Sequence, residues 1–190
     1  FLNQDCSELK GIEHSKCKQS AATSLGINWL KTLSFGPNED IALLIQLWLG
    51  IFAVNWRLLP NPGWLNSQIN TIGSFQFSTY PKLLAAILEE PSILHSLNGF
   101  HNHRKNPNEN LGRELLELYS IGEGNYTEFD VQQVALALTG YRLNAEQKVV
   151  LIPRRHDPGP HTILGRTANF DAQILASWLG KQPATSIHIC

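Results

Sequence analysis

The spacing of apolar residues between positions 107 and 140 constrains the fold of this chain more than any other feature. Apolar side chains first recur at intervals of three and four positions, at Leu111, Leu115, Leu118 and Tyr119. This period places them on one face of an α-helix, where they can pack against a core. Gly122 follows, and glycine is the residue that most often ends a helix in the left-handed conformation. The pattern therefore predicts a helix over residues 107–121.

A second helix is predicted directly after the first. Thr127 is a suitable N-cap residue, and Asp130 three positions later gives an arrangement close to a capping box. Apolar residues then recur at the spacing i, i+3, i+4 and i+7, at Val131, Val134, Ala135 and Leu138. Gly140 ends this helix, so two amphipathic helices lie close together in the chain.

Helical patterns recur elsewhere, and strands are few. Further helices are predicted over residues 21–33, 41–52, 81–90, 91–97 and 171–180. Residues 59–80 contain Pro60, Pro62, Gly63 and Gly73, which favours a long irregular crossing. The β-branched run from Val149 to Ile152 predicts one strand of a small hairpin whose partner the sequence does not identify.

These patterns predict an all-α or mainly α protein, with a single irregular helical domain and at most a small β-hairpin. Residues 1–19 are polar and lack sustained periodicity, so we expect an arm or the remnant of a preceding region. Residues 20–190 form the expected helical domain. The absence of Met, the Phe at position 1 and the Cys at position 190 indicate a fragment of a longer protein.

Charge and hydropathy limit the classes of partner. The 15 basic and 16 acidic side chains give a net charge of −1, so the chain as a whole does not attract polyanions and we expect no nucleic acid partner. The most apolar segment, residues 41–54, is shorter than the roughly 20 residues that a membrane span requires. Asn55 and Arg57 follow it at once. We expect a buried helix here and no membrane span.

The three cysteines, Cys6, Cys17 and Cys190, are too few for a disulfide framework. Cys6 and Cys17 could form one bridge that restrains the polar arm, or both could remain thiols. A zinc site built from Cys6, His14 and Cys17 would lack a fourth ligand and has no recognised spacing.

The first polar motif lies on the helix predicted over residues 107–121. Glu109, Arg113 and Glu117 are successive i, i+4 neighbours, which is typical of an exposed salt-bridge ladder worth tenths of a kcal/mol per pair. Polar side chains also gather around the helix N-terminus, where backbone N–H groups lack partners. That group is the Asn-Glu-Asn opening, Asn108, Glu109 and Asn110, and it can hold an anion, hold a cation or cap the helix. Asn110 and Glu114 form a third stripe along the helix.

The second polar motif is the stretch RRHDPGPHTILG, residues 154–165. It places His156, Asp157 and His161 within one short turn. A carboxylate beside an imidazole suits metal binding or general-base chemistry, because it orients the ring and raises its basicity. The same residues also suit a turn that only stabilises itself.

A third histidine-rich stretch precedes the first helix. His101 and His103 stand beside Arg104 and Lys105, which is more typical of a solvated loop than of a metal site. The string His-Asn-His invites comparison with a nuclease motif, but the residues of that motif are spread across a ββα unit.

These residues resemble a known family. The stretch PNENLGRELLELYSIGEGNYTEFDVQQVALALTGY, residues 107–141, is similar to the hallmark of the family called domain of unknown function 1800. HDPGPHTILG and QPATSIHI resemble two further blocks of the family. The resemblance implies a large, helix-rich, mostly bacterial protein that is uncharacterised and commonly exported, so a periplasmic or extracellular location is the expectation it carries.

The chain departs from the family pattern at several positions. Gly112 stands where Ala is usual, Tyr141 replaces Trp, and His161 stands where Lys is usual. Residues 48–52 replace the family's Trp-His-Asn-His-Phe, so that both histidines of that block are lost. These changes indicate a degenerate or altered site.

Two functions remain open, and so does the question of whether the chain is an enzyme. The first is a secreted or periplasmic domain with a metal-assisted hydrolase-like site. Its catalytic residues would be Glu114, His156 and Asp157, and a divalent metal is the candidate cofactor. Its binding residues would be Asn108, Glu109, Asn110, Arg113, Glu117 and His161.

The alternative is a structural or interaction module that does not catalyse. In this version a buried Arg113 bridges Glu117 and neighbouring backbone carbonyls, and the asparagines cap the helix, so that the polar motifs lock the fold. Partners are unknown, and contacts with the missing parts of the full-length protein are the candidates.

Overall fold

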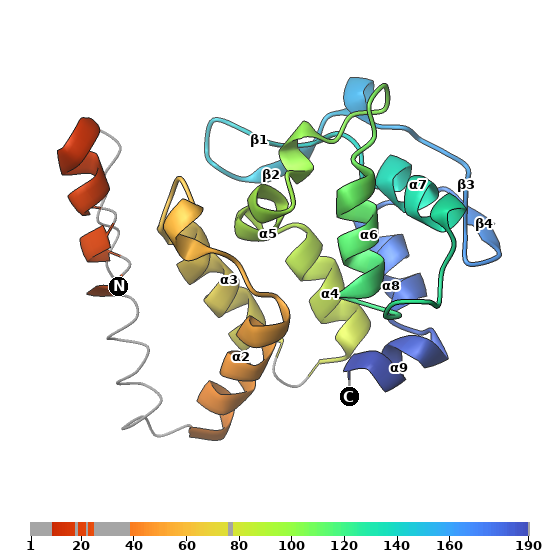
Figure 1. The fold of residues 1–190 in the computed structure, drawn as a ribbon, viewed down its shortest axis with the longest axis horizontal. Coiled ribbons are helices and arrows are strands. Elements are labelled where there is room, and N and C mark those ends of the chain that lie inside the picture. The colour runs from red at the N-terminus through yellow and green to blue at the C-terminus, as the bar shows by residue number, and fades with distance from the viewer. Residues whose placement is uncertain (1–8, 18, 22, 25–38, 76–77, 190) are drawn as a thin grey trace. The chain divides into compact units, whose positions relative to one another are not determined.

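The computed structural model describes residues 9–17, 19–21, 23–24, 39–75 and 78–189 (Figure 1). The chain divides into two compact units, residues 1–76 and 77–190. The expected boundary between a polar arm at 1–19 and a domain at 20–190 stays a prediction.

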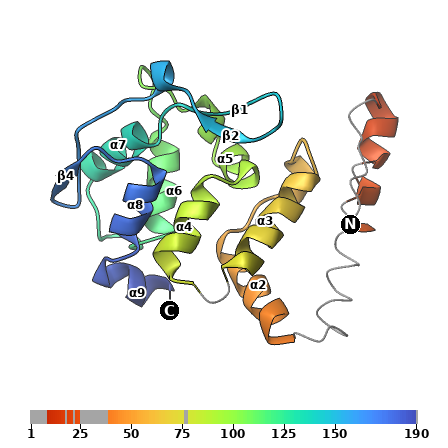
Figure 2. The same ribbon diagram turned by 180° about the vertical axis from the view of Figure 1, so that it is seen from behind.

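The first unit contains two packed helices, α2 (Glu39–Ile51) and α3 (Gly63–Ser74), joined through the 3-10 turn η1 (Trp56–Leu58). Both views show α2 and α3 side by side (Figures 1 and 2). The buried Gln68 side chain of α3 donates to the Phe52 carbonyl at 2.7 Å, which ties this helix to the end of α2. The helix predicted over residues 41–52 is confirmed within two residues, but it is not the buried helix expected, because Leu43 and Leu47 on it are exposed.

The irregular crossing predicted over residues 59–80 is wrong, because α3 occupies its middle. The prolines lie before the helix, where they do not interrupt it, and the Asn61 side chain accepts a hydrogen bond from Gly63 N at 2.8 Å. Trp64, Gln68 and Ile72 then recur every four residues and form the buried face. The prolines and glycines of this stretch obscure the helical period in the sequence.

Two expectations near the N-terminus lie mostly outside the described residues. Within the helix expected over 21–33, positions 21, 23 and 24 are helical and the remainder is not described; residues 11–17 and 19–20 are helical as well. Cys17 is disulfide-bonded. This excludes a free thiol at Cys17, but Cys6 lies outside the described residues, so a bridge between the two, one of the alternatives that the sequence left open, stays untested.

The second unit is a helical core. Helix α4 (Tyr80–Leu88) packs against α8 (Ala172–Leu179), and α6 (Glu109–Glu117) packs against α7 (Glu128–Ala137) (Figures 1 and 2). The remaining helical segments are α5 (Pro91–Ser96), η2 (Gly99–His101), η3 (Pro153–Arg155) and α9 (Pro183–Ile189). Fully buried side chains at the centre include Leu84, Ile87, Leu111, Leu115 and Leu116.

Two small antiparallel hairpins complete the second unit. Strand β1 (Tyr141–Leu143) pairs with β2 (Val149–Leu151), so β1 is the partner that the sequence left unidentified. A second hairpin, which the sequence analysis did not expect, joins β3 (His161–Ile163) to β4 (Arg166–Ala168). The expectation of a mainly helical fold is confirmed. None of the helices that the structure describes is long and apolar enough to cross a bilayer.

The predicted helix boundaries need one adjustment. Helix α6 ends at Glu117, four residues before the expected end, although Gly122 has the positive φ of 78° expected of a left-handed cap. Its N–H donates to the Leu116 carbonyl at 3.0 Å and closes the turn after the helix. The capping box of Thr127 and Asp130 on α7 and the helix before Gly180 are confirmed.

Gly112 sets the distance between α6 and α7. A Cβ atom at this position would lie 2.5 Å from the Val131 carbonyl oxygen and 3.2 Å from the Ala135 nitrogen, both in the backbone of α7. Such a separation is far inside van der Waals contact, so the two backbones approach more closely than a side chain permits. The usual Ala of the family does not fit here unless α7 shifts.

We predict that Gly112→Ala lowers the free energy of unfolding by about 1 to 3 kcal/mol, because the methyl group must displace the backbone of α7. This loss opposes the gain of roughly 0.5 to 1 kcal/mol that Ala brings to a helix interior. Urea denaturation followed by circular dichroism measures the difference.

Gly50→Ala is the matched control, because Gly50 lies in α2 and a Cβ atom there meets nothing within 4 Å. We expect this variant to be as stable as the parent or slightly more stable. Equal effects of the two substitutions would show that the close approach at Gly112 is not strained by a methyl group.

Candidate functional site

The N-terminus of α6 is capped from within its own motif. The Asn108 side chain accepts a hydrogen bond from Leu111 N at 3.2 Å, and its amide group donates to the Leu97 carbonyl at 2.9 Å and to the Asn98 carbonyl at 3.3 Å. A polar helix end can hold an anion, hold a cation or cap the helix, and the described contacts of Asn108 are those of a cap.

Asn102, which the sequence analysis did not single out, lies at the centre of these contacts. It is completely buried, its Oδ1 accepts from Asn108 N at 2.9 Å, and its Nδ2 donates to the Ala135 carbonyl at 2.8 Å. Its own carbonyl accepts from Gly140 N at 3.2 Å. One side chain therefore joins the start of α6 to the last turn of α7. In the sequence it lies between His101 and His103, in a stretch that is more typical of a solvated loop, and no local pattern marks it as buried.

Arg113 pairs with Glu128, not with Glu117. Its guanidinium makes two hydrogen bonds to the Glu128 carboxylate, at 2.6 and 3.0 Å. The Arg113 side chain is 36% exposed and that of Glu128 is 70% exposed. The expectation of a buried Arg113 that bridges Glu117 is therefore wrong, because Glu117 accepts instead from the hydroxyl of Tyr126. An exposed pair of this kind is screened by water and salt.

The other polar residues of α6 face outward or lie at its edge. Glu109 and Asn110 are exposed, and Glu114 is half-buried. Burial, with the negative charge of Glu114 as a second cause, raises the pKa of Tyr119 to about 12. The carboxylate of Glu114 thus lies near a buried phenol that stays protonated at any physiological pH.

The second motif is held by Thr139. The Thr139 hydroxyl accepts from Asp157 N at 2.8 Å, and its carbonyl lies 3.0 Å from Nδ1 of His156. Gly140, with a φ of 90°, allows the backbone of His156 to approach, because a Cβ at Gly140 would lie 2.9 Å from His156 N. The half-buried imidazole of His156 is thereby fixed against the end of α7.

Asp157 and His161 form a carboxylate–imidazole pair. Nε2 of His161 lies 3.2 Å from Oδ1 of Asp157, and the same oxygen accepts from Gly159 N at 3.1 Å. The His161 side chain is only 3% exposed, whereas that of Asp157 is 36% exposed. Nδ1 of His161 is buried and has no hydrogen-bond partner. A Cβ at Gly159 would lie 3.0 Å from that nitrogen, so the turn covers it closely.

The structure thus brings His161 to Asp157 but joins neither to the acidic residues of α6. No described hydrogen bond or ion pair connects Glu109, Glu114 or Glu117 with the histidine turn. The two motifs connect instead through Asn102 at Gly140 and Thr139 next to it. Within the part of the chain that the structure describes, no group of three or more His, Cys, Asp or Glu side chains is arranged to hold a metal ion.

Asp130 extends the network to the second hairpin. Its Oδ2 accepts from the backbone and hydroxyl of Thr127 at 2.9 and 2.6 Å, and its Oδ1 accepts from Leu164 N at 2.7 Å. Burial alone would raise the pKa of Asp130, but these hydrogen bonds outweigh it, so the pKa lies below its ordinary value.

We predict that Asn102→Ala lowers the free energy of unfolding by about 2 to 4 kcal/mol, because Asn108 N and the Ala135 carbonyl lose their buried partner. The exposed Asn106 in the same loop provides the control. Asn106→Ala should change stability by less than about 0.5 kcal/mol in the same urea titration. A similar small effect for both variants would remove Asn102 from its central role.

We also predict a pH dependence for Asp130. A carboxyl group whose pKa is depressed by folding stabilises the folded state above its unfolded pKa, about 3.9, and this contribution is lost as the pH falls through the folded pKa. Asp130→Asn should therefore lower stability at pH 7 by about 1 to 2 kcal/mol and flatten the acid limb of the stability profile. Thermal unfolding between neutral and acidic pH measures both, and an unchanged acid limb would contradict the assignment.

Comparison with known proteins identifies the family. No curated protein and no solved structure matches the chain. The model of a family described as "Protein of unknown function (DUF1800)" matches residues 7–190. Because this match covers essentially the whole chain, the protein belongs to the DUF1800 family.

Proposed function

We propose that this chain is a non-catalytic interaction module in which the two polar motifs lock the fold. The observation that carries the proposal is the complete burial of Asn102, with both ends of its amide bonded to backbone groups of different elements. A buried amide is retained at a desolvation cost, which such bonds offset.

One further motif residue, Asn108, and two residues that contact the motifs support this interpretation. Asn108, Thr139 and Asp130 all use their side chains on backbone N–H or carbonyl groups. Groups engaged in this way are not available to bind a substrate or to accept a proton. Catalytic constellations differ, because they keep reactive groups aimed at the place where a substrate reacts.

The lock does not depend on the ion pair that the sequence suggested. Arg113 and Glu128 meet at the surface, where a pair contributes little to stability. Asn102 and Asn108, which are uncharged, join the ends of two helices. We therefore retain the hypothesis of a non-catalytic module, with Asn102 in place of Arg113 as its central residue.

A secreted or periplasmic domain with a metal-assisted hydrolase-like site is the second candidate, and one observation favours it. Nδ1 of His161 is unpartnered while Nε2 faces Asp157, an arrangement that orients an imidazole. Because the Gly159 turn covers this nitrogen, general-base work at it requires the turn to move aside. A divalent ion would bring the power to activate water. Elemental analysis of the purified chain for bound zinc, manganese and other divalent metals tests this candidate.

Asp157→Ala separates the two candidates. A lock predicts that stability falls by about 1 to 2 kcal/mol, because Gly159 N and His161 Nε2 lose their acceptor. A catalytic role predicts unchanged or higher stability, since active-site groups are often held at the expense of the fold. Urea denaturation of the full chain measures the difference.

Glu123→Ala is the control for Asp157→Ala, because Glu123 is an exposed carboxylate of the same unit. We expect it to leave stability within about 0.5 kcal/mol of the parent. An Asp157→Ala variant as stable as the parent, together with stoichiometric metal in the parent, would overturn the module in favour of the hydrolase.

A further inference from the structure

Positive charge is concentrated in three segments that meet in the second unit. Residues 99–108, 140–145 and 147–156 contain no Asp or Glu. They contain six basic residues, of which Lys148 pairs with Glu146. The other five form a group that we call the basic surface, consisting of Arg104, Lys105, Arg142, Arg154 and Arg155. The rest of the chain then has 10 basic and 16 acidic residues, so the near-neutral total conceals a strongly uneven distribution.

Backbone hydrogen bonds bring the three segments together. Arg104 N donates to the Arg155 carbonyl at 3.0 Å, which places the turn after His103 beside η3. Ile152 N donates to the Gly140 carbonyl at 2.9 Å, which joins the start of η3 to the start of β1. The proximity of these like charges is therefore set by the fold and not by chance side-chain positions.

The charges of the basic surface are not neutralised within the part of the chain that the structure describes. The ion pairs there are Arg113 with Glu128, Lys148 with Glu146, and His161 with Asp157, and none includes a member of the basic surface. The pKa of His103 is lowered first by desolvation and then by the positive charges of Arg155 and other members of the basic surface. The pKa of Arg142 is lowered by desolvation and by Arg155.

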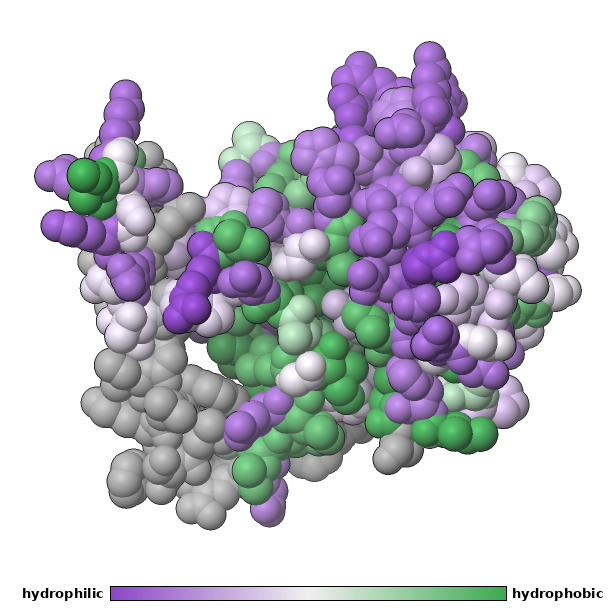
Figure 3. Space-filling view, viewed as in Figure 1, coloured by the Kyte–Doolittle hydropathy of each residue, from purple (hydrophilic) through white to green (hydrophobic). Residues whose placement is uncertain are grey.

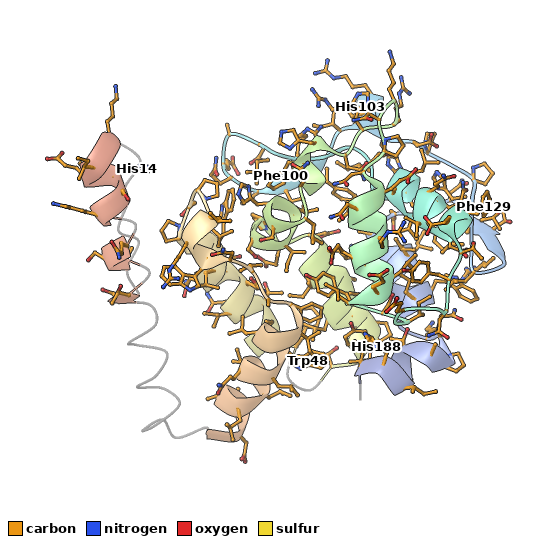
Figure 4. All side chains as sticks on the ribbon, viewed as in Figure 1. His14, Trp48, Phe100, His103, Phe129 and His188 are labelled. Atoms are coloured by element: carbon orange, nitrogen blue, oxygen red, sulfur yellow. The ribbon has the colours of Figure 1, made fainter. Side chains whose placement is uncertain are left out.

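The shape of this region favours an extended, deformable partner. Figure 4 shows long side chains ending in nitrogen that project away from the ribbon around the labelled His103. In Figure 3 the same edge is hydrophilic and protrudes. Side chains that diverge from a convex edge do not enclose a small anion. The headgroup layer of a bilayer is soft and can enclose such an edge, so diverging side chains all reach phosphates within it. A nucleic acid duplex is rigid and itself convex, so it would meet only part of the surface.

We propose that the basic surface docks this chain reversibly on an anionic phospholipid bilayer, with the guanidinium groups of Arg104, Arg154 and Arg155 on the headgroup phosphates. The half-buried guanidinium of Arg142 donates to the Tyr141 carbonyl at 2.7 Å and adds its charge beside them. Arginine suits this role because its planar fork makes paired hydrogen bonds to phosphate. The inference deepens the proposed function by naming the partner of the interaction module. Each basic side chain near such a bilayer raises the partition coefficient about five-fold, so five of them give measurable but salt-sensitive binding.

Vesicle co-sedimentation of the full chain tests the proposal. Vesicles with about 30% phosphatidylglycerol in phosphatidylcholine should bind the chain at about 0.05 M NaCl and release it at about 0.5 M, and phosphatidylcholine alone should not bind it. Arg104→Gln with Arg154→Gln should lower the partition coefficient about 25-fold, because two charges are removed. Equal binding to both kinds of vesicle, or none to either, would overturn the proposal.

Lys82→Gln with Lys181→Gln is the matched control. Both lysines are exposed in the same unit and lie outside the basic surface, so this variant has the same net charge as the arginine variant. It should keep at least a third of the parent's binding, and a loss equal to that of the arginine variant would contradict a local surface.

Binding to a short DNA duplex but not to vesicles would replace the bilayer by nucleic acid. Stability measurements on Asp157→Ala are independent of vesicle binding, so failure of the lock and failure of docking are distinguishable.

Discussion

The buried amide of Asn102 is the interaction on which the second unit depends. Its oxygen accepts from Asn108 N at the start of α6, and its nitrogen donates to the Ala135 carbonyl in the last turn of α7. The backbone carbonyl of the same residue accepts from Gly140 N beyond the end of α7. Thr139, the neighbour of Gly140, in turn holds His156 and Asp157. Because a buried amide must satisfy both ends, only one arrangement of these elements meets its requirements. The polar motifs are thus parts of one connected network.

The elements that the sequence predicted correctly are those with local signals. The cap at Thr127 and the apolar period after it define α7 without help from the rest of the chain. The hairpin of β3 and β4 has no such signal, because its turn places Leu164 at a φ of 48°, which a leucine rarely adopts alone. The carboxylate of Asp130, 34 residues earlier, holds Leu164 N there. A contact between residues so far apart in the sequence cannot be predicted from local sequence patterns.

In the candidate site, the sequence identified which residue types can form bonds, but it did not identify their partners. Spacing along a helix suggested Glu117 as the partner of Arg113, whereas the tertiary fold supplied Glu128 from the next helix. At Gly112 the missing side chain has the same kind of effect, because without a Cβ atom α6 and α7 approach until their backbones are in contact. A sequence names the groups that can bond, but the packing distance decides which of them do.

The net charge of the chain does not reveal how its charges are distributed, for a related reason. A sum over the chain treats Arg104 and a distant glutamate as cancelling, although charges farther apart than the Debye length of about 8 Å barely interact in physiological salt. Arg104 and Lys105 lie between Asn102 and Asn108, and the hydrogen bond between those two asparagines closes the loop that carries the charges. Like charges held so closely repel one another, so a freely moving loop would separate them. The uncharged lock therefore maintains the basic surface, and an anionic partner would relieve the repulsion that the lock sustains.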